Sequence, residues 1–267
     1  MKTIIDKEKF GEWAIVTGAS SGIGEEFAHQ LAELGFNLIL ASRRKAKLDE
    51  LGSYLAKKHN ISYKSVQVDL TQNKAYVKII DAAKGLDIGL LISNAGTGRP
   101  GSFLNTAFEQ LLEIVQLNAL SHLALTHHFG KSMKQNGRGG ILLTGAMGAI
   151  NGIPYMANES GTKSFVQGLG KALNAELRTT GIHVTVLVTS PTDTPIMPEL
   201  GFTKDAMPMK ALTVNQCVKE ALVALRDNKM TVIPGFKFRL MNAAVPSKLS
   251  RTMMGDMLRK NNNISIV

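Results

Sequence analysis

The sequence has few of the features that mark secreted, membrane-spanning or disulfide-stapled proteins. Its 267 residues include a single cysteine, Cys217, so no disulfide can form within the chain and we expect a reducing compartment. No uninterrupted apolar run approaches the length needed to cross a bilayer. The first ten residues carry five charged side chains instead of an apolar core, so we expect no signal peptide and a cytoplasmic protein.

Acidic residues are also scarce, with 21 Asp and Glu against 31 Lys and Arg, a formal charge of +10. Such a basic excess favours anionic ligands or surfaces. Nucleic acid is not an expected partner, because no known binding module and no interleaving of basic and aromatic residues occurs. The six histidines show no metal-ligand spacing, so no metal site is predicted.

A glycine-rich segment organises the chain. The stretch Thr17-Gly18-Ala19-Ser20-Ser21-Gly22-Ile23-Gly24 lies between an apolar run at 13–16 and a helical pattern that ends at Gly35. A glycine turn between a strand and a helix exposes backbone N–H groups and the positive helix end to a pyrophosphate. Glycine is required because a Cβ would block the tight turn or the close approach of the phosphate. The segment therefore predicts nucleotide binding.

Strand-like and helical patterns alternate along the rest of the chain. The expected strands are 13–16, 36–41, 62–68, 88–92, 140–144, 182–188 and 229–233, and the further expected helices are 45–58, 75–83, 107–133, 155–178 and 214–226. This alternation is typical of a parallel sheet covered on both faces. Without repeats or linkers, residues 1–267 are predicted to form one α/β domain with a doubly wound sheet of about seven strands.

Several motifs in this order resemble one family. The glycine turn, Asp69, Asn94-Ala95-Gly96, Asn118 and Lys163 follow at the intervals of the short-chain dehydrogenases/reductases, from Trp13 to about Pro234. The resemblance implies a Rossmann-type fold, a homodimer or homotetramer, and hydride transfer between NAD(P) and an alcohol or carbonyl. It implies that Asn118 belongs to a proton relay. It implies these cofactor contacts: Gly18, Ser20, Ser21, Gly22, Ile23, Gly24, Asp69, Leu70, Asn94, Ala95, Gly96, Lys163, Thr192 and Thr194.

The end of the second expected strand bears on the choice of cofactor. An NAD site needs a carboxylate about 20 residues after the glycines, to bind the ribose 2′-hydroxyl. Here the strand ends at Ser42, and Arg43 and Arg44 follow. Guanidinium groups bind a phosphate well, so the sequence favours NADP(H) over NAD. The alternative is that both arginines begin a solvated basic helix.

The resemblance breaks at the catalytic positions. The family's tyrosine, four residues before Lys163, is replaced by Glu159, and the family's serine, 13 residues earlier, by Ala146. Alanine donates no hydrogen bond, and a glutamate beside a lysine is expected to be ionised near pH 7 and to donate none. Tyr155, one turn before Glu159, is an alternative donor. Glu159 is alternatively a general base, or forms an i,i+4 ion pair with Lys163 that only supports the helix.

These replacements leave three interpretations of function. The first is an NADP(H)-binding family member with impaired or modified oxidoreductase chemistry, acting as a cofactor sensor or partner-binding protein. The second is a working reductase or dehydrogenase of an apolar carbonyl or alcohol. The third is a non-redox enzyme that uses Glu159 as base.

Two late segments bear on ligands and partners. A substrate lid is expected at about 195–213, where the apolar residues Met197, Leu200, Phe202, Met207 and Met209 suggest an apolar small-molecule substrate. A basic amphipathic segment at about 236–260 suggests either peripheral contact with an anionic membrane or packing on the domain or a neighbouring subunit.

Overall fold

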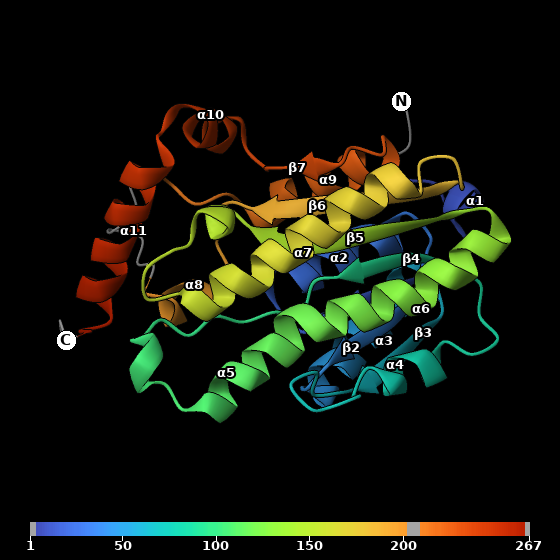
Figure 1. Cartoon of the computed structure of the whole chain (residues 1–267). Coiled ribbons are helices and arrows are strands. Elements are labelled where there is room, and N and C mark those ends of the chain that lie inside the picture. Colours follow the sequence, from blue (N-terminus) through green and yellow to red (C-terminus); the bar gives the residue numbers. More distant parts are fainter. Residues whose placement is uncertain (1–3, 202–208, 265–267) are drawn as a thin grey trace.

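The computed structural model describes residues 4–201 and 209–264 (Figure 1). One sheet of seven parallel strands runs through it in the order β3-β2-β1-β4-β5-β6-β7. The strands are β1 (Trp13–Thr17), β2 (Asn37–Ser42), β3 (Tyr63–Gln67), β4 (Ile88–Ser93), β5 (Gly139–Ala146), β6 (Ile182–Thr189) and β7 (Thr231–Val232). The predicted fold class is confirmed: a Rossmann-type, doubly wound α/β domain.

Apolar side chains on both faces of the central strands explain why the sheet is buried. All six residues of β4 are buried, as are four of the five in β1, which is usual where helices cover both faces of a parallel sheet. On one face the core contains side chains of α2 (Gly22–Glu33), α3 (Lys45–His59) and α9 (Val214–Arg226). On the other it contains side chains of α4 (Val77–Ala82), α6 (Ser121–Asn136) and α7 (Ala157–Glu176).

The long helix expected at 107–133 has three parts. A π-helical turn, η2 (Gln116–Leu120), separates α5 (Phe108–Val115) from α6. Such turns are often found at functional sites. The apolar periodicity predicted a helix here, but could not show the extra residue in the turn, because that depends on the contacts of Asn118.

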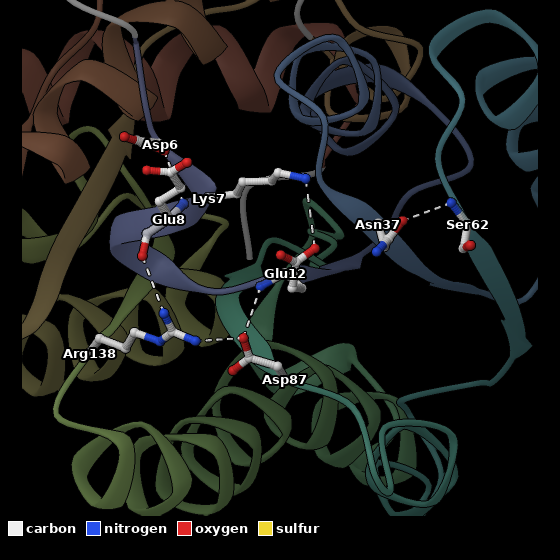
Figure 2. A network of polar contacts seen from close by, with 8 residues as sticks. All are labelled: Asp6, Lys7, Glu8, Glu12, Asn37, Ser62, Asp87 and Arg138. Carbon is white, nitrogen blue, oxygen red and sulfur yellow. Dashed lines mark hydrogen bonds and ion pairs between the residues drawn. The ribbon is translucent and has the colours of Figure 1, made fainter.

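The amino-terminal ends of the strands are closed by polar contacts (Figure 2). Asp87 Oδ2 accepts hydrogen bonds from Arg138 Nη2, at 2.8 Å, and from the backbone N of Glu12, at 3.2 Å. Arg138 Nη1 also donates to the backbone O of Glu8 in α1 (Lys7–Phe10), at 3.2 Å. These contacts tie α1 and the turns before β1, β4 and β5 together at the amino-terminal ends of the strands.

The carboxyl-terminal segment forms two helices, α10 (Phe236–Ala244) and α11 (Ser247–Asn261). α11 lies at the left of the molecule in Figure 1. Gly255 and Leu258 are its buried residues, so the segment packs on the domain, while contact with an anionic membrane stays a prediction. Among the described helices, none is long and apolar enough to span a membrane.

Candidate active site

The site lies where the strand order reverses, between β1 and β4. In open α/β sheets, ligands bind beyond the carboxyl ends of the strands at this point. Thr17, the last residue of β1, joins the two loops there, because its Oγ1 accepts hydrogen bonds from the backbone N of Asn94, at 2.9 Å, and of Ala95, at 3.0 Å. The glycine turn and the Asn94-Ala95-Gly96 segment are thereby held against each other.

The glycine turn has the shape of a phosphate cradle. Gly18 and Gly22 have φ values of 70° and 59°, which L-residues with side chains rarely adopt. A Cβ on Gly24 would overlap the carbonyl of Gly18, so no other residue fits there. α2 begins at Gly22, and the side chain of its N-cap, Ser21, makes no capping hydrogen bond. The first N–H groups of α2 are thus available to an anion, and these residues fit a dinucleotide pyrophosphate.

Two arginines flank this turn. Arg44 donates from Nε and Nη2 to Ser20 Oγ, at 3.0 and 2.8 Å, and from Nη2 to Ser21 Oγ, at 2.7 Å. Arg43 and Arg44 are exposed, and no carboxylate ends β2, whose last residue is Ser42. The positive charge predicted for a 2′-phosphate therefore lies directly beside the glycine turn.

One groove of about 960 Å³ brings most of the predicted residues together. From the predicted set, it is lined by Gly18, Ser20, Ser21, Gly22, Ile23, Arg43, Arg44, Asp69, Leu70, Asn94, Ala95, Gly96, Ala146, Glu159, Lys163 and Thr194. Gly24, Asn118, Tyr155 and Thr192 are not among its described lining residues. Gly24 and Asn118 shape the loops behind the groove, and Thr192 is buried in the segment after β6, where its Oγ1 donates to the backbone O of Ser190 at 2.8 Å.

Glu159 and Lys163 face the groove from the first turns of α7. Lys163 Nζ donates to the backbone O of Thr144 in β5, at 2.9 Å. Glu159 Oε2 is buried and has no hydrogen-bond partner among the described residues. The i,i+4 ion pair considered from the sequence is thus replaced by a lysine held on β5 and a carboxyl group left unpaired.

Comparison with known proteins identifies the family. A model of the short chain dehydrogenase family matches residues 12–205, more than half of the chain. The chain belongs to this family. Similar proteins include very-long-chain 3-oxoacyl-CoA reductases of Neurospora crassa, 40% identical over 185 residues, and Pyricularia oryzae, 41% identical over 181. The matched regions cover 67% and 66% of this chain but 56% and 55% of those proteins, so the chain spans about half the length of these curated relatives.

Solved structures of the family agree in fold. A 7β-hydroxysteroid dehydrogenase superposes with a TM-score of 0.85 at 26% identity, covering 93% of this chain and 98% of that one. A short-chain dehydrogenase of Sphingobium yanoikuyae in complex with NADPH superposes with a TM-score of 0.78 at 28% identity, covering 89% and 94%. Together with the reductases, these relatives favour a functional oxidoreductase over the impaired family member that the sequence placed first.

Burial changes the charge expected of Glu159. It raises the pKa of this carboxyl from 4.5 to about 7, and the positive charge of Lys163 opposes the rise. Burial also lowers the pKa of Lys163 from 10.5 to about 8, against the opposite effect of the Glu159 charge. With a pKa of about 7 the carboxyl is partly protonated near pH 7, a shift that the spacing of residues along a helix does not reveal.

Asn118 serves this short-chain dehydrogenase as a clamp on the loop after β4. Its Oδ1 accepts from the backbone N of Thr97, at 3.0 Å, and its Nδ2 donates to the backbone O of Thr97, at 2.7 Å. Asn118 lies within the π turn η2. A role in proton relay stays a prediction.

His122 is a positioning residue that sequence reasoning missed. It is fully buried on α6, and its Nε2 lies 3.0 Å from the backbone O of Ala95, while its Nδ1 lies 2.9 Å from Ser93 Oγ. Burial, and then the charge of Lys163, lower its pKa to about 3, so the ring is neutral. It then donates from Nε2 to Ala95 and accepts from Ser93. The sequence feature that could have pointed to His122 is its position four residues after Asn118, on the same helical face.

Tyr155 lies away from the groove's described lining. Its φ of 63° is unusual for a side-chain-bearing residue, and its backbone O accepts a hydrogen bond from Gly101 N at 2.8 Å. The residue thus shapes the turn before α7. These contacts give no support to Tyr155 as the substitute proton donor.

Described parts of the predicted lid and the residue Asn262, after α11, line the groove. α8 (Ile196–Glu199) lines it, and Met197, Leu200 and Met209 lie in described parts of the predicted lid, whereas Phe202 and Met207 lie outside the described residues. Asn262, just after α11, also lines the groove, and Asn261 Nδ2 donates to the backbone O of Gly201 at 2.7 Å. Sequence reasoning missed Asn262, because no local pattern shows that α11 returns to the lid. No cluster of three or more potential metal ligands occurs in the described part of the chain.

Proposed function

We propose that this short-chain dehydrogenase is an NADP(H)-dependent reductase of an apolar carbonyl compound. The observation that carries the proposal is the groove itself, which joins the phosphate cradle and Arg44 at one end to Lys163 and Glu159 at the other. A bound NADPH supplies a hydride to the carbonyl carbon. The similar reductases support this direction of the reaction.

The residues of the groove have separate parts in this reaction. The glycine turn and the N-terminus of α2 hold the pyrophosphate, and Arg43 and Arg44 hold the 2′-phosphate. Lys163 has three donors, and Thr144 accepts one of them, so two remain for the nicotinamide ribose hydroxyls. Asn118 and His122 keep the Asn94-Ala95-Gly96 segment beside them.

Part of the groove wall is apolar. Ile114 and Leu117 line the groove from α5 and η2, and Ile196 and Leu200 from α8 and the residue after it. Such walls take an apolar acyl or alkyl chain, with the polar atoms of the substrate toward Lys163 and Glu159. A 3-oxoacyl-CoA is therefore the first substrate to test, followed by ketones and aldehydes with long apolar groups.

A titration tests the choice of cofactor. We expect the purified protein to bind NADPH more tightly than NADH, and Arg44→Ala to weaken NADPH binding by roughly 10-fold or more, since charge-assisted bonds contribute about 1.5–3 kcal/mol. NADH affinity should change little. Lys47→Ala, an exposed lysine on α3, is the matched control. Equal loss for both cofactors would contradict a 2′-phosphate role for Arg44.

A second candidate function is a non-redox reaction with Glu159 as general base. The unpaired Oε2 and the raised pKa favour it, because an unpaired carboxylate near neutrality accepts protons well. NADPH oxidation followed by its absorbance separates the two functions. The reductase oxidises NADPH in proportion to carbonyl added, whereas an elimination or isomerisation converts substrate with no net oxidation.

A further inference from the structure

Glu159 occupies a place that the fold shapes around its carboxyl group. The loop after β4 passes directly over it, and a Cβ on Gly98 would overlap Glu159 Oε2 and lie 2.7 Å from Met156 Cε. The same loop passes Lys163, since a Cβ on Gly96 would lie 2.8 Å from Nζ. A Cβ at either position would meet the tip of a flexible side chain, so the loop passes close to both groups. The carboxyl of the half-buried Glu159 thus lies between α7 and the loop, at the wall of the groove.

One oxygen of this carboxyl is buried without a hydrogen-bond donor in the part of the chain that the structure describes. Oε2 has no hydrogen-bond partner among the described residues, and Lys163 Nζ is bonded to Thr144 O instead. An unpaired buried carboxylate is costly, whereas the neutral acid loses far less on burial. The rise in the pKa of Glu159 to about 7 has this cause. Near neutral pH, a large share of the molecules then carry an O–H group at the groove wall.

The other charged groups near the carboxyl do not reverse this balance. The charge of Lys163, on the same helix, lowers the pKa of Glu159 but by less than burial raises it. His122 on α6 is neutral, and the Arg99 and Glu113 side chains, from the loop after β4 and from α5, lie 3.6 Å apart as an ion pair. Glu199 on α8 also lines the groove.

We propose that Glu159 is the catalytic proton donor of the reduction. This proposal rests on the reductase function proposed above. The carbonyl carbon accepts a hydride from a reduced nicotinamide, and the carbonyl π electrons move to the oxygen. That oxygen takes the proton of the Glu159 carboxylic acid. A C–H and an O–H bond form, the C=O π bond and the carboxyl O–H bond break, and Glu159 is left as a carboxylate.

The residues around Glu159 favour the carboxylate that remains after proton transfer. The new carboxylate lies one helical turn from Lys163, whose positive charge stabilises it until a solvent proton restores the acid. Ala146, also at the groove wall, cannot donate a hydrogen bond to the substrate oxygen. A donor whose pKa lies near the working pH is efficient in both giving up and regaining its proton. Glu159 meets this condition.

The test combines kinetics with infrared spectroscopy of Glu159→Gln. The variant keeps the shape of the side chain but has no acidic proton, so we expect kcat for carbonyl reduction to fall roughly 10²–10⁴-fold, with NADPH affinity little changed. Wild-type kcat should fall as the pH rises above about 7. Infrared spectra at about pH 6 should contain a protonated carboxyl C=O band that disappears at about pH 9 and is absent from Glu159→Gln. Glu176→Gln, an exposed glutamate on the same helix, is the matched control and should retain the band and full activity.

Each outcome decides between the proposals. If the wild type reduces carbonyls and Glu159→Gln does so equally well, Glu159 is not the donor although the reductase function stands. A missing band at about pH 6 also overturns the donor role, whatever the activity. A wild type that binds no NADPH and reduces no carbonyl overturns both proposals.

Discussion

Glu159 and Lys163 show how a single residue's environment governs its chemistry. Lys163 is buried and Glu159 is half-buried at the groove wall, and burial moves the pKa of each toward neutrality. The pKa of Glu159 in the folded protein lies above its usual 4.5. The folded state therefore binds this proton more tightly than the unfolded state does, and its stability falls as the pH rises from about 4.5 through about 7.

The first prediction follows from this linkage. Above about pH 7 the ionised Glu159 destabilises the fold by on the order of 3 kcal/mol, and Glu159→Gln removes that penalty. The free energy of unfolding of the variant, relative to wild type, should therefore rise between about pH 5 and about pH 8. Urea unfolding at several pH values measures it. The exposed Glu176→Gln should show no such trend, and a flat difference for Glu159→Gln would contradict the raised pKa.

At the scale of elements, α11 connects the carboxyl terminus to the lid. Gly255 packs against Pro154, and a Cβ at this position would lie 2.9 Å from Pro154 Cβ and Cγ. At its other end, Asn261 bonds to Gly201, just after α8. α11 thus links the turn before α7 to the residue that follows α8 and Leu200.

Gly255→Val tests this connection. We expect the larger side chain to force α11 away from Pro154 and to weaken the Asn261–Gly201 bond. Such overpacking destabilises the fold by about 1–3 kcal/mol. We expect faster hydrogen exchange in α8 and α11 and a higher KM for the carbonyl substrate, with NADPH affinity nearly unchanged. Thr252→Val, at an exposed position of the same helix, should behave as wild type. Equal exchange rates in Gly255→Val and wild type would show that α11 does not hold the lid.

At the scale of the whole molecule, apolar side chains are exposed on α5 and α7. Phe108 and Leu112 are 65% and 49% exposed on α5, and Phe165 is 43% exposed on α7. The two helices are in contact, so these side chains can form part of one surface. Exposed apolar residues grouped in this way are typical of a protein–protein interface. The expected homodimer or homotetramer would use this surface.

Light scattering tests the oligomer. We expect wild type to elute as a dimer or tetramer and Phe108→Glu with Leu112→Glu to be monomeric, because two charges would have to be buried in the interface. Circular dichroism should confirm that the variant remains folded. Tyr54→Glu, which replaces another exposed apolar side chain on α3, should leave the oligomer intact. A monomeric wild type would contradict the homo-oligomer.

Much of the fold and of the arrangement of the candidate cofactor site was predictable from local patterns. The expected strand at 13–16 is β1 with one residue added, and the helix at 214–226 has its predicted bounds. Gly18, Gly22 and Arg44 lie where motif spacing placed them, because the turn between a strand and its following helix is a local structure. His122 and Asn262 were missed, because their contacts come from segments distant in sequence.

The sequence by itself determined the alternation of strands and helices, the phosphate cradle, the basic residues after β2 and the carboxyl group at position 159. These properties depend on neighbouring residues, whose periodicity and side-chain chemistry act over a few positions. Only the tertiary structure decided that Lys163 bonds to Thr144, that Gly98 lies over Glu159 and that Oε2 of its carboxyl lacks a hydrogen-bond partner among the described residues. The protonation of Glu159 depends on solvent exclusion by α7 and the loop after β4, and exclusion of water is a property of the packed chain.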